Sequence, residues 1–358
     1  MFSRKLLDLW IFVPTLLLLI IGIIAIVSIK PENLPSHIMF LSIGILFFTV
    51  ILFIDKNILY SFSGYLYIFG LFLLLLPLIF GTVTRGAVRW IDIGIFTIQP
   101  SEIIKPLVIL FSATYWSAVK KFSIKKLLRY LIYVSPSVGL VILQPDLGSA
   151  LIIVVGIVTS LLFSGITFKQ TLITILFICL ISPIAWFAMH DYQRNRIMNF
   201  VDPYRDPLGT GYNAIQAKIA VGSGIIMGKG IGRGTQSHLA FLPEKHNDFI
   251  FASYAEEFGF AGSMVLLLLY FILFIRVILI SKRVENSADQ IVLHGLLAII
   301  FIQTMVNVGM NIGIMPIAGV TLPLISYGGS SLITTLMCFG LICNVASDLQ
   351  RKPVIRIT

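Results

Sequence analysis

Long apolar runs separated by short polar segments make up most of the chain. A membrane-spanning helix needs about 20 predominantly apolar residues. Ten runs approach that length, at residues 9–29, 38–54, 62–80, 99–119, 127–144, 148–165, 171–189, 249–280, 290–314 and 328–347. The first run follows Arg4 and Lys5, but it is too long for a signal peptide and no small-residue cleavage site follows it. We therefore expect an all-α polytopic membrane protein with ten transmembrane helices.

Composition agrees with a membrane protein. Of the 358 residues, 58% are hydrophobic and only 12% are charged, whereas soluble domains carry about 25% charged residues. The three cysteines, Cys179, Cys338 and Cys343, all lie inside apolar runs without disulfide or metal spacing. They are predicted to be small packing residues.

The basic residues indicate how the helices are oriented. Of 26 lysines and arginines, seven lie in the long loop of residues 190–250 and fifteen lie on the side of the termini, which leaves Lys30, Arg85, Arg89 and Lys105 on the opposite side. Because basic residues concentrate in cytoplasmic loops, both termini are predicted to be cytoplasmic. The loop between the seventh and eighth helices is then extracytoplasmic. Most of the net charge of +10 is explained by the basic residues of these cytoplasmic loops, which argues against nucleic-acid binding.

The predicted outer face gathers polar motifs. The loop TRGAVRWIDIG carries Arg85, Arg89 and Trp90, and the fourth helix then opens with QPSEIIK. Glu102 and Lys105 share one face of that helix at i, i+3. They suit either a substrate contact or an ion pair that only holds the helix.

Further polar positions lie at the other helix ends. The turn QPDLGS places Asp146 at the membrane boundary, where it suits a ligand, a turn or a helix cap. Gln303, Asn307 and Asn311 follow one another at four-residue steps on the ninth helix, a polar stripe that must face the bundle interior. The segment GVTLPLISYGGSS, which contains Ser326, breaks the chain before the last helix. Such a break at membrane depth requires a covering of protein or a watery cavity.

The long loop of residues 190–250 is predicted to be ordered, since it contains proline and glycine turn positions and one helical pattern. Between Tyr212 and Val221, Ile215 and Ile219 with Ala220 form an apolar stripe. A short amphipathic helix in the membrane interface fits this pattern.

The stretch from Gly234 to Gly259 is the most polar part of the chain and leads directly into the eighth apolar run. Asp248 stands at the junction, where an ionisable group is costly unless it faces a cavity. Two interpretations use this position: a helix N-cap or a catalytic carboxylate. Asn247 could supply the cap and leave Asp248 for chemistry.

Five motifs in order give the chain a family resemblance: RWIDIG with QPSE, QPDLGSA, DPLGTGYNAIQAKIAVGSG, GTQSHLAFLPEKHNDFIFASYAEEFGF and PLISYGGSS. They resemble the SEDS family of cell-wall polymerases, and the forms GTQS and DPLG are closer to its RodA branch (elongation) than to its FtsW branch (division). The resemblance implies one integral membrane domain over residues 1–358. It also implies a peptidoglycan glycosyltransferase that polymerises lipid II outside the cytoplasmic membrane and inverts configuration. Partners would be a class B penicillin-binding protein and other membrane proteins of the elongation complex.

Two positions depart from the family pattern. Asn247 replaces the usual Thr, and Ala240 replaces the usual Glu before LPE. The loss of the Glu argues against a mechanism that needs two acids in this stretch.

The expected chemistry requires one base and several cations. A single carboxylate can take the proton of the attacking sugar hydroxyl, so Asp248 is the candidate general base. The departing diphosphate needs cations rather than a second acid. The candidate substrate-binding residues are Arg85, Arg89, Trp90, Glu102, Lys105, Asp146, Arg194, Arg196, Lys218, Lys245, Asn307 and Ser326.

Two questions stay open at this point. Carboxylates and diphosphate together attract Mg²⁺ or Mn²⁺, but no ligand cluster assigns a metal. The alternative function is a lipid II flippase, since intramembrane polar residues and a broken helix also suit a translocation path. A scaffold that recruits wall enzymes would not need polar residues at membrane depth. The clustering of reactive groups on the outer face favours the enzyme.

Overall fold

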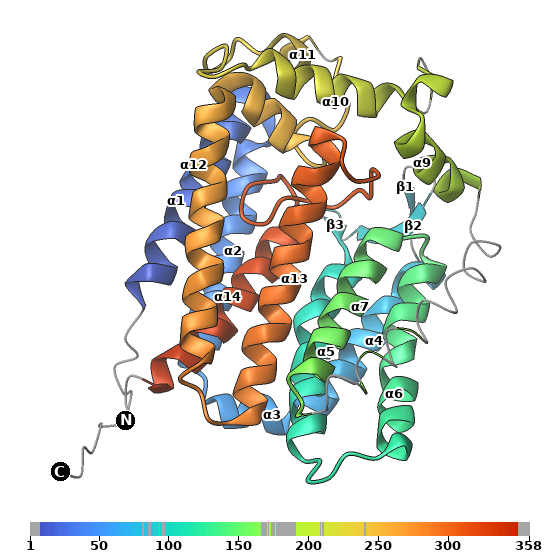
Figure 1. Ribbon diagram of the computed structural model, residues 1–358, viewed down its shortest axis with the longest axis vertical. Coiled ribbons are helices and arrows are strands. Elements are labelled where there is room, and N and C mark those ends of the chain that lie inside the picture. Colours follow the sequence, from blue (N-terminus) through green and yellow to red (C-terminus); the bar gives the residue numbers. More distant parts are fainter. Residues whose placement is uncertain are drawn as a thin grey trace.

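In the computed structural model, long helices run side by side between two ends of a bundle (Figure 1). The structure describes residues 8–349 except 81, 85–86, 93, 95–96, 166–169, 171, 173–175, 177–190, 208, 210 and 240. Seven of the described helices are long and apolar enough to cross a membrane. They are α1 (Leu9–Ile29), α2 (Leu34–Phe53), α4 (Ser63–Phe80), α6 (Ile124–Leu143), α12 (Ile250–Ser281), α13 (Ser287–Ile312) and α14 (Gly329–Leu349).

Two further helices, α5 (Pro100–Ser117) and α7 (Leu147–Leu162), correspond to the fourth and sixth predicted runs. The fourth, with Glu102 and Lys105 in its first turns, is less apolar than its neighbours. Nine of the ten predicted runs are thus helical, while the seventh, residues 171–189, lies outside the described residues except for Leu172 and Leu176. The 3-10 turn Pro31–Asn33 leads into α2, and α3 (Lys56–Ser61) lies at the lower end.

The all-α prediction is wrong for one segment. A three-stranded antiparallel sheet consists of β1 (Thr82–Thr84), β2 (Ala87–Asp92) and β3 (Thr97–Ile98). Thr82 pairs with Trp90, and Ile91 pairs with Ile98. β-branched and aromatic residues favour strands, but strands this short leave only a weak pattern in the sequence.

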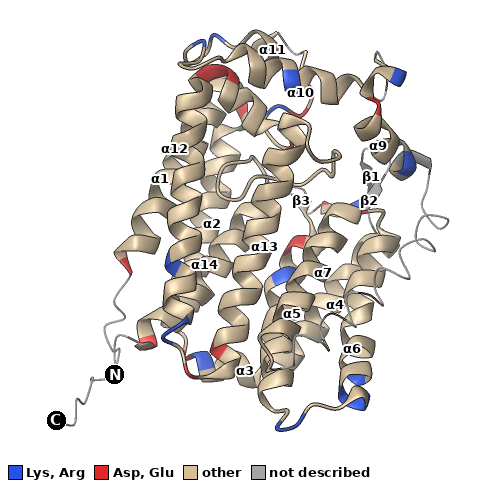
Figure 2. Ribbon diagram, in the orientation of Figure 1, with Lys and Arg blue, Asp and Glu red and all other residues tan. Residues whose placement is uncertain are grey.

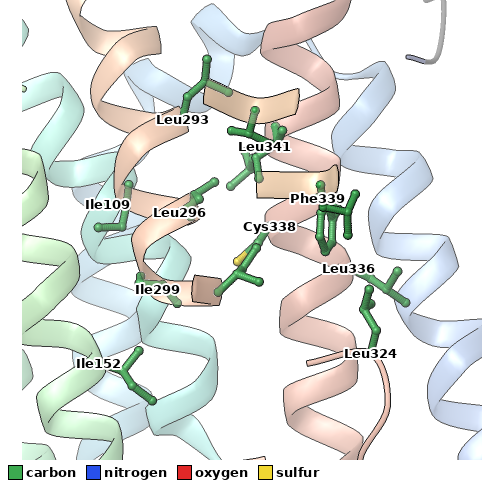
Figure 3. Packing of buried hydrophobic residues seen from close by; sticks show 14 of the residues in the cluster. Ile109, Ile152, Leu293, Leu296, Ile299, Leu324, Leu336, Cys338, Phe339 and Leu341 are labelled. Atoms are coloured by element: carbon green, nitrogen blue, oxygen red, sulfur yellow. The ribbon is translucent and has the colours of Figure 1, made fainter. Parts of the chain in front are cut away.

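The apolar core extends through the whole bundle, and one part of it lies where α5, α7, α13 and α14 pack together. Ile109, Leu296 and Ile299 pack at the interface of α5 and α13, and Cys338 lies beside them on α14 (Figure 3). Cys338 and Cys343 are buried free thiols, as the packing interpretation predicted. Cys179 lies outside the described residues.

A layer of short helices crosses the upper end of the bundle. It consists of α9 (Asp191–Val201), the 3-10 turn Pro203–Arg205, α10 (Tyr212–Ser223) and α11 (Thr235–His238) (Figure 1). The helix expected from Tyr212 is therefore present as α10. Its buried residues are Ala217 and Ala220, whereas Ile219 is 44% exposed. Small residues thus line the side of α10 that packs on the protein, and the placement of Ile219 in a membrane interface stays a prediction.

Helix α12 is broken at Gly259, whose φ of 67° and ψ of −164° are not helical. The chain of residues 225–230 pairs with the break: Phe260 N–H donates to Ile225 O (2.9 Å), and Lys229 N–H donates to Glu256 O (3.0 Å). Only glycine adopts this backbone conformation at little cost. The first part of α12 therefore turns across the upper end instead of continuing the span (Figure 1).

Candidate functional site

Asp248 lies just before α12, in the turn that follows the polar stretch. Phe249 occupies the N-cap position of α12, so Asp248 lies one residue before the cap. Its side chain is partly exposed, whereas the next residues, Phe249 and Ile250, are buried. The carboxylate is therefore not sealed inside the bundle.

The peptide of Asp248 is held from below by α13. Asn307 Nδ2 donates to Asp248 O (3.0 Å) and to Val320 O (2.7 Å). Asn311 Nδ2 also donates to Asp248 O (3.1 Å), and its Oδ1 accepts from Ala252 N–H (3.1 Å). Both amides are fully buried. The polar stripe predicted on the ninth helix thus faces the interior; Asn307 and Asn311 bind main chain, whereas Gln303 donates to the hydroxyls of Thr321 and Ser331.

The broken segment before α14 holds the other side of the turn. Ser326 Oγ donates to Asn247 O (2.8 Å) and accepts from Leu322 N–H (2.7 Å). Tyr327 N–H donates to His246 O (2.9 Å). Residues 246–248 are therefore fixed between α13 and the segment of residues 313–328, which we call the outer segment.

One residue of the outer segment, Gly319, lies close to both Asp248 and the cation Arg196 of α9. A Cβ added at Gly319 would lie 3.7 Å from Asp248 Oδ2 and 3.7 Å from Arg196 Nη1. Arg196 and Lys218 line a pocket of about 310 Å³ between α9, α10 and the end of α13, together with Asn195, Asn199, Asn213 and Met315. The carboxylate and the cation-lined pocket are thus neighbours across Gly319.

A second polar cluster surrounds Asp146, the N-cap of α7. Asp146 Oδ1 accepts from Ser149 N–H (3.1 Å) and lies 3.7 Å from Arg89 Nη1. Asp146 Oδ2 accepts from Gln99 Nε2 (2.8 Å) and Ser101 Oγ (3.2 Å). The capping interpretation of Asp146 is confirmed, and the same carboxylate organises the start of α5.

Glu102 and Lys105 form a buried ion pair. Lys105 Nζ lies 2.6 Å from Glu102 Oε1, and the two side chains are 1% and 9% exposed. The ion-pair interpretation of these residues is confirmed, and their role toward substrate stays a prediction.

The remaining predicted cations are dispersed. Lys245 Nζ donates to Ser237 O in α11. Burial lowers the pKa of Lys245, the charge of Lys30 lowers it further, and Glu32 opposes both. Arg194 is partly buried on α9, Trp90 is partly buried on β2, and Arg85 lies outside the described residues.

Comparison with known proteins places these motifs in one family. The profile of the FtsW/RodA/SpoVE family, described as cell cycle proteins, matches residues 6–351. The peptidoglycan glycosyltransferase MrdB of Escherichia coli (strain K12) is 41% identical over 307 residues, which covers 85% of this chain and 83% of MrdB. The chain belongs to the FtsW/RodA/SpoVE family.

Two solved structures share the fold of this family member. A chain from the structure described as "Structural coordination of polymerization and crosslinking by a peptidoglycan synthase complex" superposes with a TM-score of 0.84 at 30% identity, covering 97% of this chain and 100% of that chain. The rod shape determining protein RodA of Thermus thermophilus superposes with a TM-score of 0.73 at 27% identity, covering 96% of this chain and 97% of RodA. The SEDS, RodA-like expectation is confirmed, and the protein is a multi-pass cytoplasmic membrane peptidoglycan glycosyltransferase.

Sequence reasoning gave Gln99 no role of its own, and it gave Glu256 only a structural or partner-facing role. Gln99 joins Asp146 to α14, since its N–H donates to Ser330 Oγ (2.8 Å). Buried Glu256 accepts from Gln236 N–H (2.9 Å) and Ser237 N–H (3.0 Å) at the start of α11. Both residues stand inside the quoted motifs, which was the available signal.

The described residues offer no protein-held metal site: nowhere among them do three or more His, Cys, Asp or Glu side chains gather as ligands. Ala240, where the family pattern has Glu, lies outside the described residues.

Proposed function

We propose that this enzyme polymerises lipid II into glycan strands at the outer face of the cytoplasmic membrane, with Asp248 as general base. The observation that carries the proposal is the position of Asp248. Its partly exposed carboxylate lies across Gly319 from Arg196, beside a pocket lined by two cations. A base beside a cationic pocket suits a glycosyl transfer, because the acceptor hydroxyl loses a proton while the donor sugar loses its diphosphate close by.

The chemistry divides between the two groups. Asp248 removes the proton from the acceptor sugar hydroxyl as that oxygen attacks the anomeric carbon of the donor. The bond to the lipid diphosphate breaks, and the configuration at that carbon inverts. Arg196 and Lys218 stabilise the negative charge on the departing diphosphate. Glycoside hydrolysis normally requires a pair of carboxylates, and this reaction needs only one.

The cluster around Asp146 supplies the second part of the proposed substrate surface. Arg89 and Trp90 lie on β2, next to the start of α5, where Asp146 and Gln99 hold the helix end. We assign Arg85, Arg89, Trp90, Arg194 and Lys245 to contacts with the polar parts of the lipid-linked sugars. Asn307 and Ser326 support the site through the main chain.

The proposed topology has ten helices, both termini in the cytoplasm and residues 190–250 outside, within one membrane domain of residues 1–358. Three observations support it. α1 begins and α14 ends toward the lower end of the bundle, whereas α9, α10 and α11 cover the upper end (Figure 1). Lysines and arginines gather at the lower end around α3 and α6 (Figure 2). Cytoplasmic loops are the ones enriched in such residues.

We further propose that the enzyme works with a class B penicillin-binding protein and other membrane proteins of the elongation complex. The support is the likeness to a chain of a complex that coordinates polymerization and crosslinking. A polymerase alone makes strands, so a crosslinking partner completes the wall.

Purified protein supplied with lipid II and no other polymerase tests the base. Asp248→Asn should lower kcat by about 10²- to 10⁴-fold, the usual contribution of a general base, while the thermal unfolding temperature changes little. Asp202→Asn is the matched control, because Asp202 caps a 3-10 turn in the same upper layer by accepting from Tyr204 N–H (3.1 Å). Polymerisation at the normal rate by Asp248→Asn would refute the assignment.

A further inference from the structure

The amide of Asn311 occupies an unusual place in the first turn of α12. Its Nδ2 donates to Asp248 O (3.1 Å), and its Oδ1 accepts from Ala252 N–H (3.1 Å). Residues 248 and 252 are four apart, so these are the two groups that a helical hydrogen bond would join. The Asn311 amide therefore lies between the two groups. Its Nδ2 donates to Asp248 O in place of Ala252 N–H, and its Oδ1 accepts from Ala252 N–H in place of Asp248 O.

This arrangement separates Asp248 from the helix. When a side chain inserts into the i to i+4 ladder, the helix opens at that point. Asn307 strengthens the effect, since its Nδ2 donates to the same carbonyl of Asp248 (3.0 Å) and also to Val320 O (2.7 Å). The carbonyl of Asp248 is thus directed into α13, which fixes the peptide plane from which the carboxylate projects.

The two amides also couple Asp248 to the outer segment. Val320, which Asn307 binds, is the next residue after Gly319, where an added Cβ would lie 3.7 Å from both Asp248 Oδ2 and Arg196 Nη1. One rigid helix therefore sets the position of both the base and the backbone beside it. Preorganisation of this kind is needed because a displacement of about 1 Å can cost about 10²-fold in rate.

We propose that Asn311, assisted by Asn307, is a positioning residue that keeps Asp248 out of the first turn of α12 and holds its carboxylate toward the Arg196 side of Gly319. The inference rests on the proposed function of Asp248 as the base. It assigns the polar stripe of α13 to catalytic geometry rather than to substrate contact.

The structure offers a matched control in Asn344 on α14. Its Nδ2 donates to Ile51 O (2.6 Å) and Ile54 O (2.8 Å), and it is 1% exposed. Asn344 thus performs the same main-chain clamping as Asn311, but at the end of α2, away from Asp248. A purely structural role of Asn311 would make the two alanine variants behave alike.

The test measures lipid II polymerisation per folded molecule for Asn311→Ala and Asn344→Ala, with thermal unfolding in detergent for both. Asn311→Ala should lower kcat by about 10²-fold with KM within about twofold, because the base is displaced while the pocket remains. Asn344→Ala should lose comparable thermal stability and keep kcat within about twofold. If Asn311→Ala loses no more kcat than Asn344→Ala, the positioning role is refuted.

A second variant keeps the test decisive if Asn311→Ala does not fold. Asn311→Leu preserves most of the volume and buries no charge, but it removes both the donor to Asp248 O and the acceptor for Ala252 N–H, so it leaves no cavity and should still lose kcat. Full activity of Asn311→Leu would refute the inference.

The double variant separates this inference from the function on which it rests. If Asn311 acts through Asp248, Asn311→Ala should cost nothing further in the Asp248→Asn background, because coupled residues are not additive. An inactive Asp248→Asn beside a fully active Asn311→Ala would retain the base and remove only the positioning role. A fully active Asp248→Asn would remove the base and the positioning role together.

Discussion

The ion pair of Glu102 and Lys105 illustrates what a charge requires inside this bundle. The two side chains face each other at 2.6 Å in the first turns of α5 and are almost completely buried. A buried ion is costly unless a partner compensates it, and the first two turns of α5 contain both members of the pair. Each charge of the pair is therefore compensated by a partner on the same helix.

Removal of one partner should be far more harmful than reversal of both. Glu102→Gln leaves Lys105 as an uncompensated buried charge and should destabilise the protein by about 3–5 kcal/mol. The double change Glu102→Lys with Lys105→Glu retains the opposite charges at i, i+3 and should restore most of that loss. Thermal unfolding in detergent micelles measures both effects.

The activity of the charge-reversed protein then decides the second role of the pair. Near-normal polymerisation with restored stability would leave the pair as a holder of α5. Lost polymerisation at restored stability would establish that the orientation of the charges matters to substrate.

At the scale of elements, Glu256 acts as a latch between α12 and α11. Its buried carboxylate accepts from two consecutive N–H groups at the start of α11 and from Lys229 Nζ (2.8 Å). Negative charge at a helix N-terminus is favourable. The motif GTQSH is thereby tied to the part of α12 that precedes the break at Gly259.

Glu256→Gln should release this latch while the spanning helices stay intact. The substitution replaces an acceptor oxygen by a donor group, and hydrogen bonds to a charged group contribute about 1.5–3 kcal/mol each. We expect faster hydrogen exchange at the amides of Gln236 and Ser237, with exchange in α13 unchanged. Glu32→Gln is the control, because Glu32 is an exposed acid at the same end of the bundle. Equal protection of residues 235–238 in both variants would contradict the latch.

The whole molecule shows how far the sequence alone could lead. Bilayer thickness fixes the length of a spanning helix, so nine of the ten apolar runs were located within a few residues. The break at Gly259 was not foreseeable, because residues 225–230 impose it from a distance in the chain. The three-stranded sheet was missed because its strands are too short to leave a clear pattern in the sequence.

The candidate site could also be predicted only in part. Asp248 was identifiable because a carboxylate beside an apolar run demands an explanation. The partners of Asn307 and Ser326 were not identifiable, since they are main-chain carbonyls that only the fold brings near. A polar side chain at membrane depth can be recognised from the sequence, but the group to which it hydrogen-bonds cannot.

Side-chain ion pairs hold both ends of the molecule. At the lower end, Arg276 binds Asp8 through Nη2 at 2.6 Å, and Lys56 binds Asp289 at 2.7 Å and Asp348 at 3.2 Å. At the upper end, Lys229 lies 2.8 Å from buried Glu256, beside the hydrogen bonds that α13 and the outer segment make to main chain. The lower ion pairs lie away from the proposed site, so their contribution to stability can be tested separately from activity.

Lys56→Met tests the ion pairs of the lower end. The substitution leaves Asp289, with a side chain 6% exposed, without its nearest cation, and Tyr60 Oη (2.6 Å) remains its donor. We expect a loss of about 3 kcal/mol, at the low end for a buried pair, because the Lys56 side chain is 17% exposed. Polymerisation per folded molecule should stay near normal, since the site is at the other end.

The pH dependence follows from the shift at Lys56. Burial lowers its pKa, but the hydrogen bonds and charges of Asp289 and Asp348 outweigh burial, so the pKa is raised. A raised folded pKa means that the stabilisation is complete below the unfolded value of about 10.4 and is lost as pH rises through the folded value. The unfolding temperatures of wild type and Lys56→Met should therefore converge above pH about 10.4. A constant difference across that range would show that Lys56 stabilises the lower end by packing rather than by charge.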